Sequence, residues 1–240
     1  MLTALGREAP EKVGTASYNS DLLMKRIPRS AAASLLAVLA LSLVCVASKE
    51  FSMPKTQPAA AYPAHDYHSA ERVTVGLDPY EGPPKSNIFV VNYREMDLLP
   101  ILMVITNDSD QPIELTNIKA ELVTGDGTKL SVATDDDIYR RLSHPNASGA
   151  RTPLPFPTKR VKGGVNSKEF SEISAATFKA KAVEPRGSQS GFLFFDVSDV
   201  PNPLRGARFY LTGVQDSSGN ALMYFEVPME KASGTDASKP

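Results

Sequence analysis

The sequence predicts a mainly β protein, an antiparallel β-sandwich with a central insertion that carries one or two short helices. Residues 98–123 hold two apolar runs joined by a polar turn, and this is the pattern of two successive strands. A matching apolar run, QSGFLFFDV, lies at residues 189–197. Nineteen prolines against fifteen glycines, with no tryptophan, favour strands and long loops over a helical bundle.

The composition limits the number of domains and the classes of function that the chain can have. Its 240 residues, 42% of them hydrophobic, are enough for one core, and the length alone would allow a second small domain. The formal net charge of −1 provides no basic surface for nucleic acid. The single cysteine, Cys45, lies in the N-terminal apolar stretch, so a domain that begins after it has neither a disulfide nor a thiol nucleophile.

Residues 24–47 are expected to be a signal peptide or an N-terminal anchor. A positive region with Lys25, Arg26 and Arg29 precedes an apolar run over 31–44, and small residues then favour cleavage after Ala47. The apolar run is short for a membrane span, which takes about 20 residues. An uncleaved anchor over 31–47 stays open. In both cases the rest of the chain is predicted to be extracytoplasmic, in the periplasm, in the cell envelope or secreted.

Two features of this leader have alternative interpretations. The polar residues 1–23 in front of it suggest that translation starts at Met24, and a long positive region is the other interpretation. Cys45 matches the lipid-modified residue of bacterial lipoproteins, but Val44 stands where that pattern expects a small residue.

The remaining chain divides into a tether, one domain and a tail. Residues 48–70, rich in Pro, Ala, Lys and Gln, predict a flexible tether, and residues 231–240 a disordered tail. A single sandwich is predicted over 71–230. Its strands, or extended apolar runs, are expected at residues 72–77, 88–91, 98–106, 113–123, 129–132, 179–183, 189–197, 207–214 and 221–227.

The insertion at residues 134–178 changes the hydrophobic period. Thr134 precedes three aspartates, Asp135 to Asp137, and Arg140 and Arg141 follow at the far end, so a helix is predicted over 135–142. A second short helix is expected within 166–178. The stretch between them, 144–164, is rich in Pro and Gly and predicts an irregular loop.

Seven or eight short strands with helices only in one insertion fit an immunoglobulin-like sandwich. The stretch ITNDSDQPI at 105–113 is followed by a Gly-Asp-Gly hairpin, and VEPRG at 183–187 runs into GFLFF at 191–195. Together with the aromatic closing strand at 224–226, these motifs resemble those of secreted bacterial immunoglobulin-like domains of unknown function. The resemblance covers about 72–230, implies a sandwich outside the cytoplasm, and transfers no catalytic or binding residue.

One cluster has residues that bind metals. His65 and His68, with Asp66 between them, offer ligands for copper or zinc, and Met96 and Met103 offer soft ligands for Cu(I). The simpler interpretation is a solvated segment of the tether, with Met103 in the core. The sequence therefore assigns no metal ligand and no cofactor.

The other polar motifs also have structural explanations. His144 lies between Ser143 and Pro145 in the irregular loop, and no glycine-flanked nucleophile accompanies it. The consecutive acids 135–137 lack the alternate spacing of a calcium loop, and helix capping explains them. Residues 125–127 form a hairpin turn, since no Lys-Ser/Thr follows as in a phosphate loop. No catalytic residue is assigned.

Strand alternation places Phe192 and Phe194 on one face of a strand and Leu193 and Phe195 on the other. If both faces are apolar, the strand is either covered on both sides or presents one face as an interaction patch. We expect one face of the strand to be buried under the helices of the insertion 134–178. The basic residues Lys159, Arg160 and Lys162 suit anionic headgroups or an acidic partner, or else a solvated loop.

The sequence thus predicts a non-enzymatic extracytoplasmic module, structural or protein-binding, in the cell envelope. Its expected partner is another envelope protein, contacted through a sheet edge or the insertion. No nucleic acid is expected, and membrane contact is expected only through an uncleaved leader or a lipidated Cys45. The alternative function is a periplasmic copper- or zinc-handling domain that uses His65 and His68. A third hypothesis, an enzyme built around His144, is the least favoured.

Overall fold

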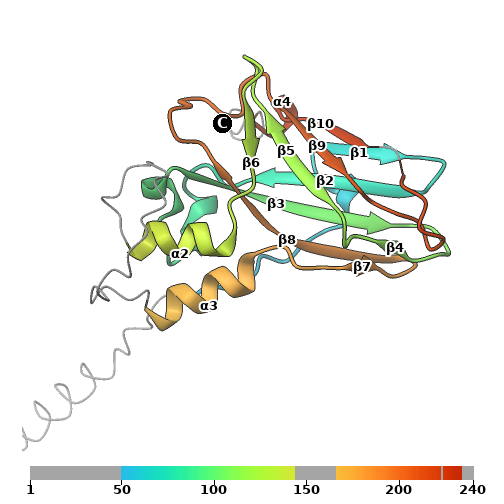
Figure 1. Ribbon diagram of the computed structural model, residues 1–240, viewed down its shortest axis with the longest axis horizontal. Helices are drawn as coiled ribbons and strands as arrows, with labels where there is room; N and C mark the ends of the chain where they lie inside the picture. The colour runs from blue at the N-terminus through green and yellow to red at the C-terminus, as the bar shows by residue number, and fades with distance from the viewer. Residues whose placement is uncertain (1–49, 144–165, 223, 234–240) are drawn as a thin grey trace, which may run out of the picture. The chain divides into compact units, whose positions relative to one another are not determined.

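The computed structural model describes residues 50–143, 166–222 and 224–233, which form antiparallel β-sheets with few helices (Figure 1). One four-stranded sheet has the order β1-β2-β3-β8, a second has the order β10-β9-β5-β6, and β4 pairs with β7. The strands are β1 (Ala64–His68), β2 (Val73–Pro79), β3 (Leu98–Asn107), β4 (Ile113–Glu114), β5 (Lys119–Val123), β6 (Lys129–Ser131), β7 (Ala182–Val183), β8 (Gly187–Asp196), β9 (Arg208–Thr212) and β10 (Phe225–Pro228). The predicted leader and segment 1–23 lie outside the described residues.

Strand β3 is the centre of its sheet, and all its residues are buried. It pairs with β2, where Met103 lies opposite Leu77, and with β8, where Leu102 lies opposite Phe192. Successive side chains of a strand point to opposite faces, so a strand that is apolar on both faces over residues 98–105 requires a hydrophobic layer on each side. The sheet accordingly lies between two cores.

The first core fills the space between the two four-stranded sheets. The inward residues of β2, β3 and β8 meet those of β5, β9 and β10 there, among them Val75, Met103, Phe195, Leu122, Phe209 and Phe225. This is the two-layer packing expected of a β-sandwich.

The second core lies on the opposite face of the β1-β2-β3-β8 sheet. Phe192 and Phe194 of β8 pack there under helices α2 (Asp135–Ser143) and α3 (Ser167–Ala176). The ring of Phe192 also contacts Tyr80 and Phe89 edge-on, at centroid distances of 4.9 and 5.0 Å. In Figure 1 both helices lie below this sheet, away from β5 and β9. The predicted burial of Phe192 and Phe194 under the insertion is confirmed.

Both predicted helices are present, α2 with its predicted cap at Thr134 and α3 with a cap at Asn166 that was not predicted from the sequence. The Asn166 side chain accepts hydrogen bonds from the backbone of Lys168 and Glu169, and the Glu169 side chain accepts one from the Asn166 N–H. Thr134 and Asp137 make the matching reciprocal contacts at the start of α2. Such contacts satisfy amide groups that a helix start leaves without partners. A further short helix, α4 (Glu230–Ser233), extends into the stretch 231–240 that was predicted to be a disordered tail, so that prediction is wrong for residues 231–233.

The predicted flexible tether over 48–70 is wrong for its described part. Strand β1 pairs along its length with β2, and the 3-10 helix η2 (Ala59–Ala61) contains the fully buried Ala59. The Ala59 N–H donates to the Thr106 hydroxyl at 2.9 Å. Close approach is possible because β2 has Gly76 at this point, where a Cβ atom would overlap the Ala59 carbonyl.

The long connection between β2 and β3 also differs from expectation. Residues 88–91 do not form a strand, and the connection instead contains 3-10 helices η3 (Lys85–Ile88) and η4 (Tyr93–Met96). No helix within the described ranges is long and apolar enough to cross a membrane.

Candidate functional site

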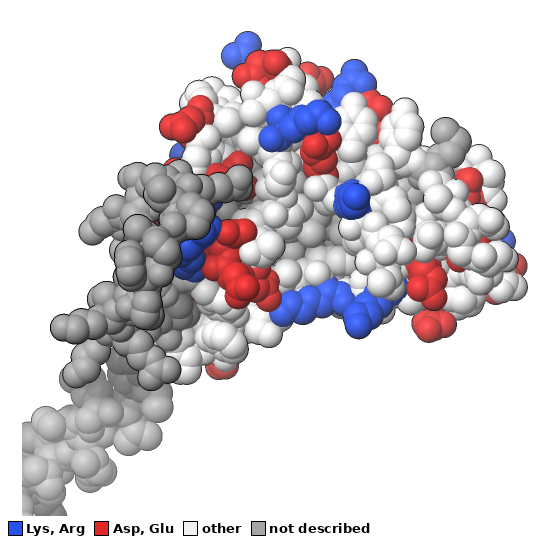
Figure 2. Space-filling view, in the orientation of Figure 1, with Lys and Arg blue, Asp and Glu red and all other residues white. Residues whose placement is uncertain are grey.

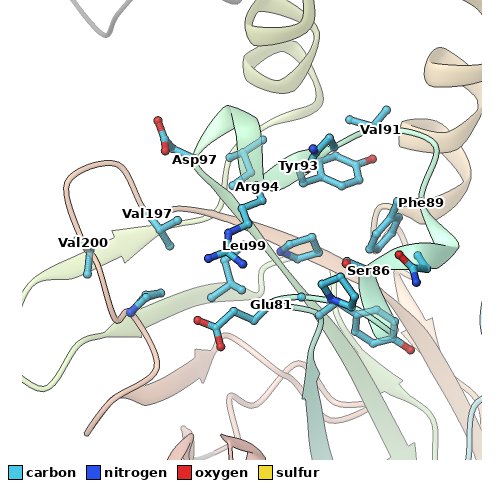
Figure 3. A pocket seen from close by; sticks show the side chains of 18 of the residues that line it. Glu81, Ser86, Phe89, Val91, Tyr93, Arg94, Asp97, Leu99, Val197 and Val200 are labelled. Atoms are coloured by element: carbon cyan, nitrogen blue, oxygen red, sulfur yellow. The ribbon is translucent and has the colours of Figure 1, made fainter.

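A cavity of about 540 Å³ opens at the end of the sandwich where β3 begins. One wall is the connection between β2 and β3, residues 80–97, and the other is the loop that follows β8, which contributes Val197, Val200, Pro201 and Pro203 (Figure 3). Its volume is in the range of pockets that bind small molecules or the side chains of a partner.

The lining combines an apolar floor with a polar rim. Leu99 and Pro100 of β3 join Val197 and Val200 in the apolar part. The polar part comes from Glu81, Ser86, Asn87 and Arg94 on the 80–97 connection. Such a mixture suits a ligand that has both an apolar body and polar groups.

The 80–97 wall is held by a buried carboxylate from the insertion. Glu172 of α3 is only 2% exposed, and its two carboxylate oxygens accept hydrogen bonds from the backbone N–H groups of Val90 at 2.5 Å and Val91 at 3.2 Å. Burial, and then the charge of Glu172, raise the pKa of Tyr93 well above its ordinary value. Tyr93 therefore stays a neutral phenol in the wall.

A second contact from the insertion joins the two walls. Arg141 of α2 donates to the Met96 carbonyl at 2.7 Å and forms an ion pair with Asp196, at the end of β8. The Val197 N–H donates to the Asp97 carbonyl at 2.9 Å. Burial alone would raise the pKa of Asp196, but hydrogen bonds from Ser198 and Arg141 outweigh it and hold the pKa below its ordinary value.

Two opposite charges line the cavity without pairing. Arg94 and Glu81 are both exposed, and among the described residues neither has an ion-pair partner within 4.0 Å. In Figure 3 the two side chains lie on either side of Leu99. The cavity therefore offers an anion-binding and a cation-binding group beside an apolar surface.

The structure does not bring His65 and His68 together. They are three positions apart on β1, so their side chains point to opposite faces of the sheet. The His65 Nδ1 lies 2.6 Å from the Tyr62 carbonyl, whereas the His68 ring stacks on Phe225 at 4.0 Å. In the described part of the chain, no three His, Cys, Asp or Glu side chains gather as a metal site.

The remaining sequence candidates have structural contacts or lie outside the described residues. Asp135 pairs with Lys179 at 3.2 Å, and Asp137 caps α2. Residues 125–127 form the turn between β5 and β6, with Gly127 at φ +88°. Met103 is buried in the first core, as expected. His144, Lys159, Arg160, Lys162 and Cys45 are outside the described residues.

Sequence reasoning missed both Glu172 and Arg94. Glu172 looks like a solvated helix residue, because an acid in a short polar helix is common. Arg94 follows a proline- and glycine-rich loop, and that composition was the only signal for a long connection at this place. A long loop between strands is itself a place where function often lies.

The comparisons with known proteins do not identify a relative. A scan against protein-family models matches no family, and a search of curated proteins finds no match.

Proposed function

We propose that this protein is a non-enzymatic module that acts outside the cytoplasm, in the cell envelope, and binds another protein there. In this proposal it is an immunoglobulin-like sandwich. The strand orders β2-β3-β8 and β10-β9-β5-β6 support that assignment, because they match the orders A-B-E and G-F-C-C′ of such domains. The predicted leader at residues 24–47 supports the location.

The observation that carries the proposal is the cavity with its braced walls. Glu172 fixes one wall to α3, and Arg141 ties that wall to the end of β8. Loops held in one conformation lose little entropy when they bind, so they suit recognition. In protein interfaces, such pockets receive the few anchor side chains that supply most of the binding energy.

The chemistry of the cavity favours binding over catalysis. Among the residues that the structure describes, its lining includes no histidine or cysteine, which are common bases and nucleophiles. The charged residues on the face seen in Figure 2 are of both signs and interspersed, a surface that suits protein partners better than nucleic acid.

Photo-crosslinking in cells tests the proposal. A photoreactive residue in place of Asn87, on the rim, is expected to give a specific adduct with one envelope protein. Val200→Arg, which fills the cavity, should abolish that adduct. Ser218→Arg, on the exposed loop at the opposite end of the sandwich, should retain it.

Two results would count against the proposal. One is an adduct that is equally strong with Val200→Arg, because the partner then does not use the cavity. The other is a native protein that fractionates with the cytosol, because the module would then not be exported.

A further inference from the structure

We propose that the cavity selects its occupant by two opposite charges. Arg94 pairs with a carboxylate of the partner, and Glu81 pairs with a cationic group. An apolar side chain between them packs on Leu99, Val197 and Val200. The occupant is thus a segment of the partner protein in which an acidic and a basic residue flank an apolar one. This inference rests on the proposed function, since it names what the partner presents.

Arg94 differs from most other arginines of the described chain. Arg140, Arg186 and Arg208 each form an ion pair with an aspartate or glutamate, and Arg141 does so with Asp196. Arg94 has no such partner within 4.0 Å in the described ranges, although it lines the cavity. A guanidinium that is free to make two parallel hydrogen bonds binds carboxylates with defined geometry.

Glu81 supplies the opposite charge on the same connection. It also lines the cavity and has no cation within 4.0 Å among the described residues. Arg94 and Glu81 therefore do not neutralise each other directly. Both charges are thus available to a ligand in the cavity.

The position of Arg94 is set by its surroundings. It belongs to η4, which ends at Asp97 in a left-handed conformation with φ 54°, and the Asp97 N–H donates to the Arg94 carbonyl. Its Nη1 atom lies 3.8 Å from the point where a Cβ of Gly82 would be. The guanidinium thus lies over Gly82 and lines the cavity.

The apolar surface between the charges accommodates one aliphatic side chain. Leu99 is 3% exposed, and Val197 and Val200 are half-buried, so they present a firm apolar floor. A cavity of about 540 Å³ has room for a few side chains and not for a folded domain. Charges at its rim add specificity and orientation to the apolar contact.

Peptide binding to the native mature protein tests this inference. The probes are acetyl-Glu-Leu-Lys-amide and its reverse, acetyl-Lys-Leu-Glu-amide, followed by NMR shifts of Val197 and Val200. Because the two charges have fixed positions, one order is expected to bind at least about tenfold more tightly, which corresponds to about 1.4 kcal/mol. Peptides with Gln in place of Glu or Lys should lose that preference.

Charge reversal separates recognition from a structural role. Glu81→Lys or Arg94→Glu alone should weaken the preferred peptide about tenfold, and the double variant should prefer the opposite order. Lys119→Glu, an exposed reversal on β5, should change nothing. Loss of folding would not produce a reversed preference.

The outcomes distinguish this inference from the proposed function. No binding of either peptide, equal binding of both orders, or binding of free leucine alone would overturn the inference. If the crosslinked adduct is nevertheless lost in Val200→Arg, the proposed function stands without it. The opposite result is that the unmodified protein binds the peptides as expected while the Val200→Arg variant still forms the crosslinked adduct. In that case the partner uses another surface, and the proposed function is wrong.

Discussion

The Oε2 atom of Glu172 lies 2.5 Å from the backbone nitrogen of Val90, which is 82 residues earlier in the chain. This contact joins α3 to the connection that forms one wall of the cavity. Since the carboxylate is buried and also accepts the Val91 N–H, it satisfies two amides of a loop that has no strand partner. The helical insertion thus acts as a brace for the candidate site.

Replacing Glu172 should loosen that wall. Glu172→Ala leaves the Val90 and Val91 amides without an acceptor, and an unsatisfied buried group costs about 1–3 kcal/mol. We expect the free energy of unfolding to fall by about that amount, with faster hydrogen exchange at these two amides. Glu114→Gln, at an exposed position, is the control. Unchanged exchange at Val90 would show that the contact does not hold the loop.

The Arg141–Asp196 ion pair should make the cavity sensitive to acid. The folded-state pKa of Asp196 lies below its ordinary value of 3.8, so the folded state favours the charged carboxylate. Its stabilising contribution is complete above about pH 4 and is lost as pH falls through the folded pKa.

Urea denaturation between about pH 2 and pH 6 measures this contribution. Arg141→Ala should reduce stability at pH 6 and flatten its decline with acid, because the folded-state pKa of Asp196 moves toward the ordinary value. Arg140→Ala removes the exposed Arg140–Asp137 ion pair within α2. This variant should lose stability with falling pH nearly as steeply as the unmodified protein does. Parallel pH profiles for Arg141→Ala and the unmodified protein would contradict the prediction.

Gly76 should not tolerate a methyl group. A Cβ at this position would overlap the Ala59 carbonyl, so the segment around η2 would have to move off the sheet. Gly76→Ala is expected to cost about 1–3 kcal/mol, the usual range for overpacking, and to expose Ala59. At Gly82 the nearest atom is 3.8 Å away, so Gly82→Ala should be nearly neutral in thermal denaturation. Equal midpoints of thermal denaturation for Gly76→Ala and Gly82→Ala would contradict this prediction.

The two histidines of β1 should behave as unrelated residues. His68 stacks on the buried Phe225 and lies 3.3 Å from Asp66, so His68→Ala should lower the free energy of unfolding by about 1 kcal/mol. His65 is exposed, and His65→Ala should have a smaller effect. Titration with zinc or copper should leave the midpoint of thermal unfolding unchanged. A stoichiometric shift that either substitution abolishes would restore the metal hypothesis.

The sequence was most informative where burial imposes a simple pattern. The run over residues 98–106 has apolar residues on both faces, so an inner position in the sheet was predicted for it. The alternation of Phe192 to Phe195 divided those residues correctly between the two cores. The helix cap at Thr134 was equally clear, because capping depends on neighbours in the chain.

The rest depends on contacts between distant segments. Residues 50–62 are rich in proline and alanine and show no period, so nothing indicated that Ala59 would fit against Gly76. The cavity is built from loops, whose conformations have no repeating pattern. Glu172 and Val90 meet only because the fold brings α3 over the 80–97 connection, and one sequence contains no signal of such a pair.

The ring of Phe51 stacks on Phe89 at 5.7 Å, four residues after the predicted cleavage site at Ala47. If the leader is cut after Ala47, Ser48, Lys49 and Glu50 alone separate the scissile bond from the docked ring, a reach of about 10 Å even when fully stretched. A protease that binds its substrate in an extended conformation has little access to a cleavage site so close to a docked ring. If the chain is cleaved there, we expect processing to precede the docking of Phe51 on Phe89, so that maturation of the N-terminus comes before completion of the fold.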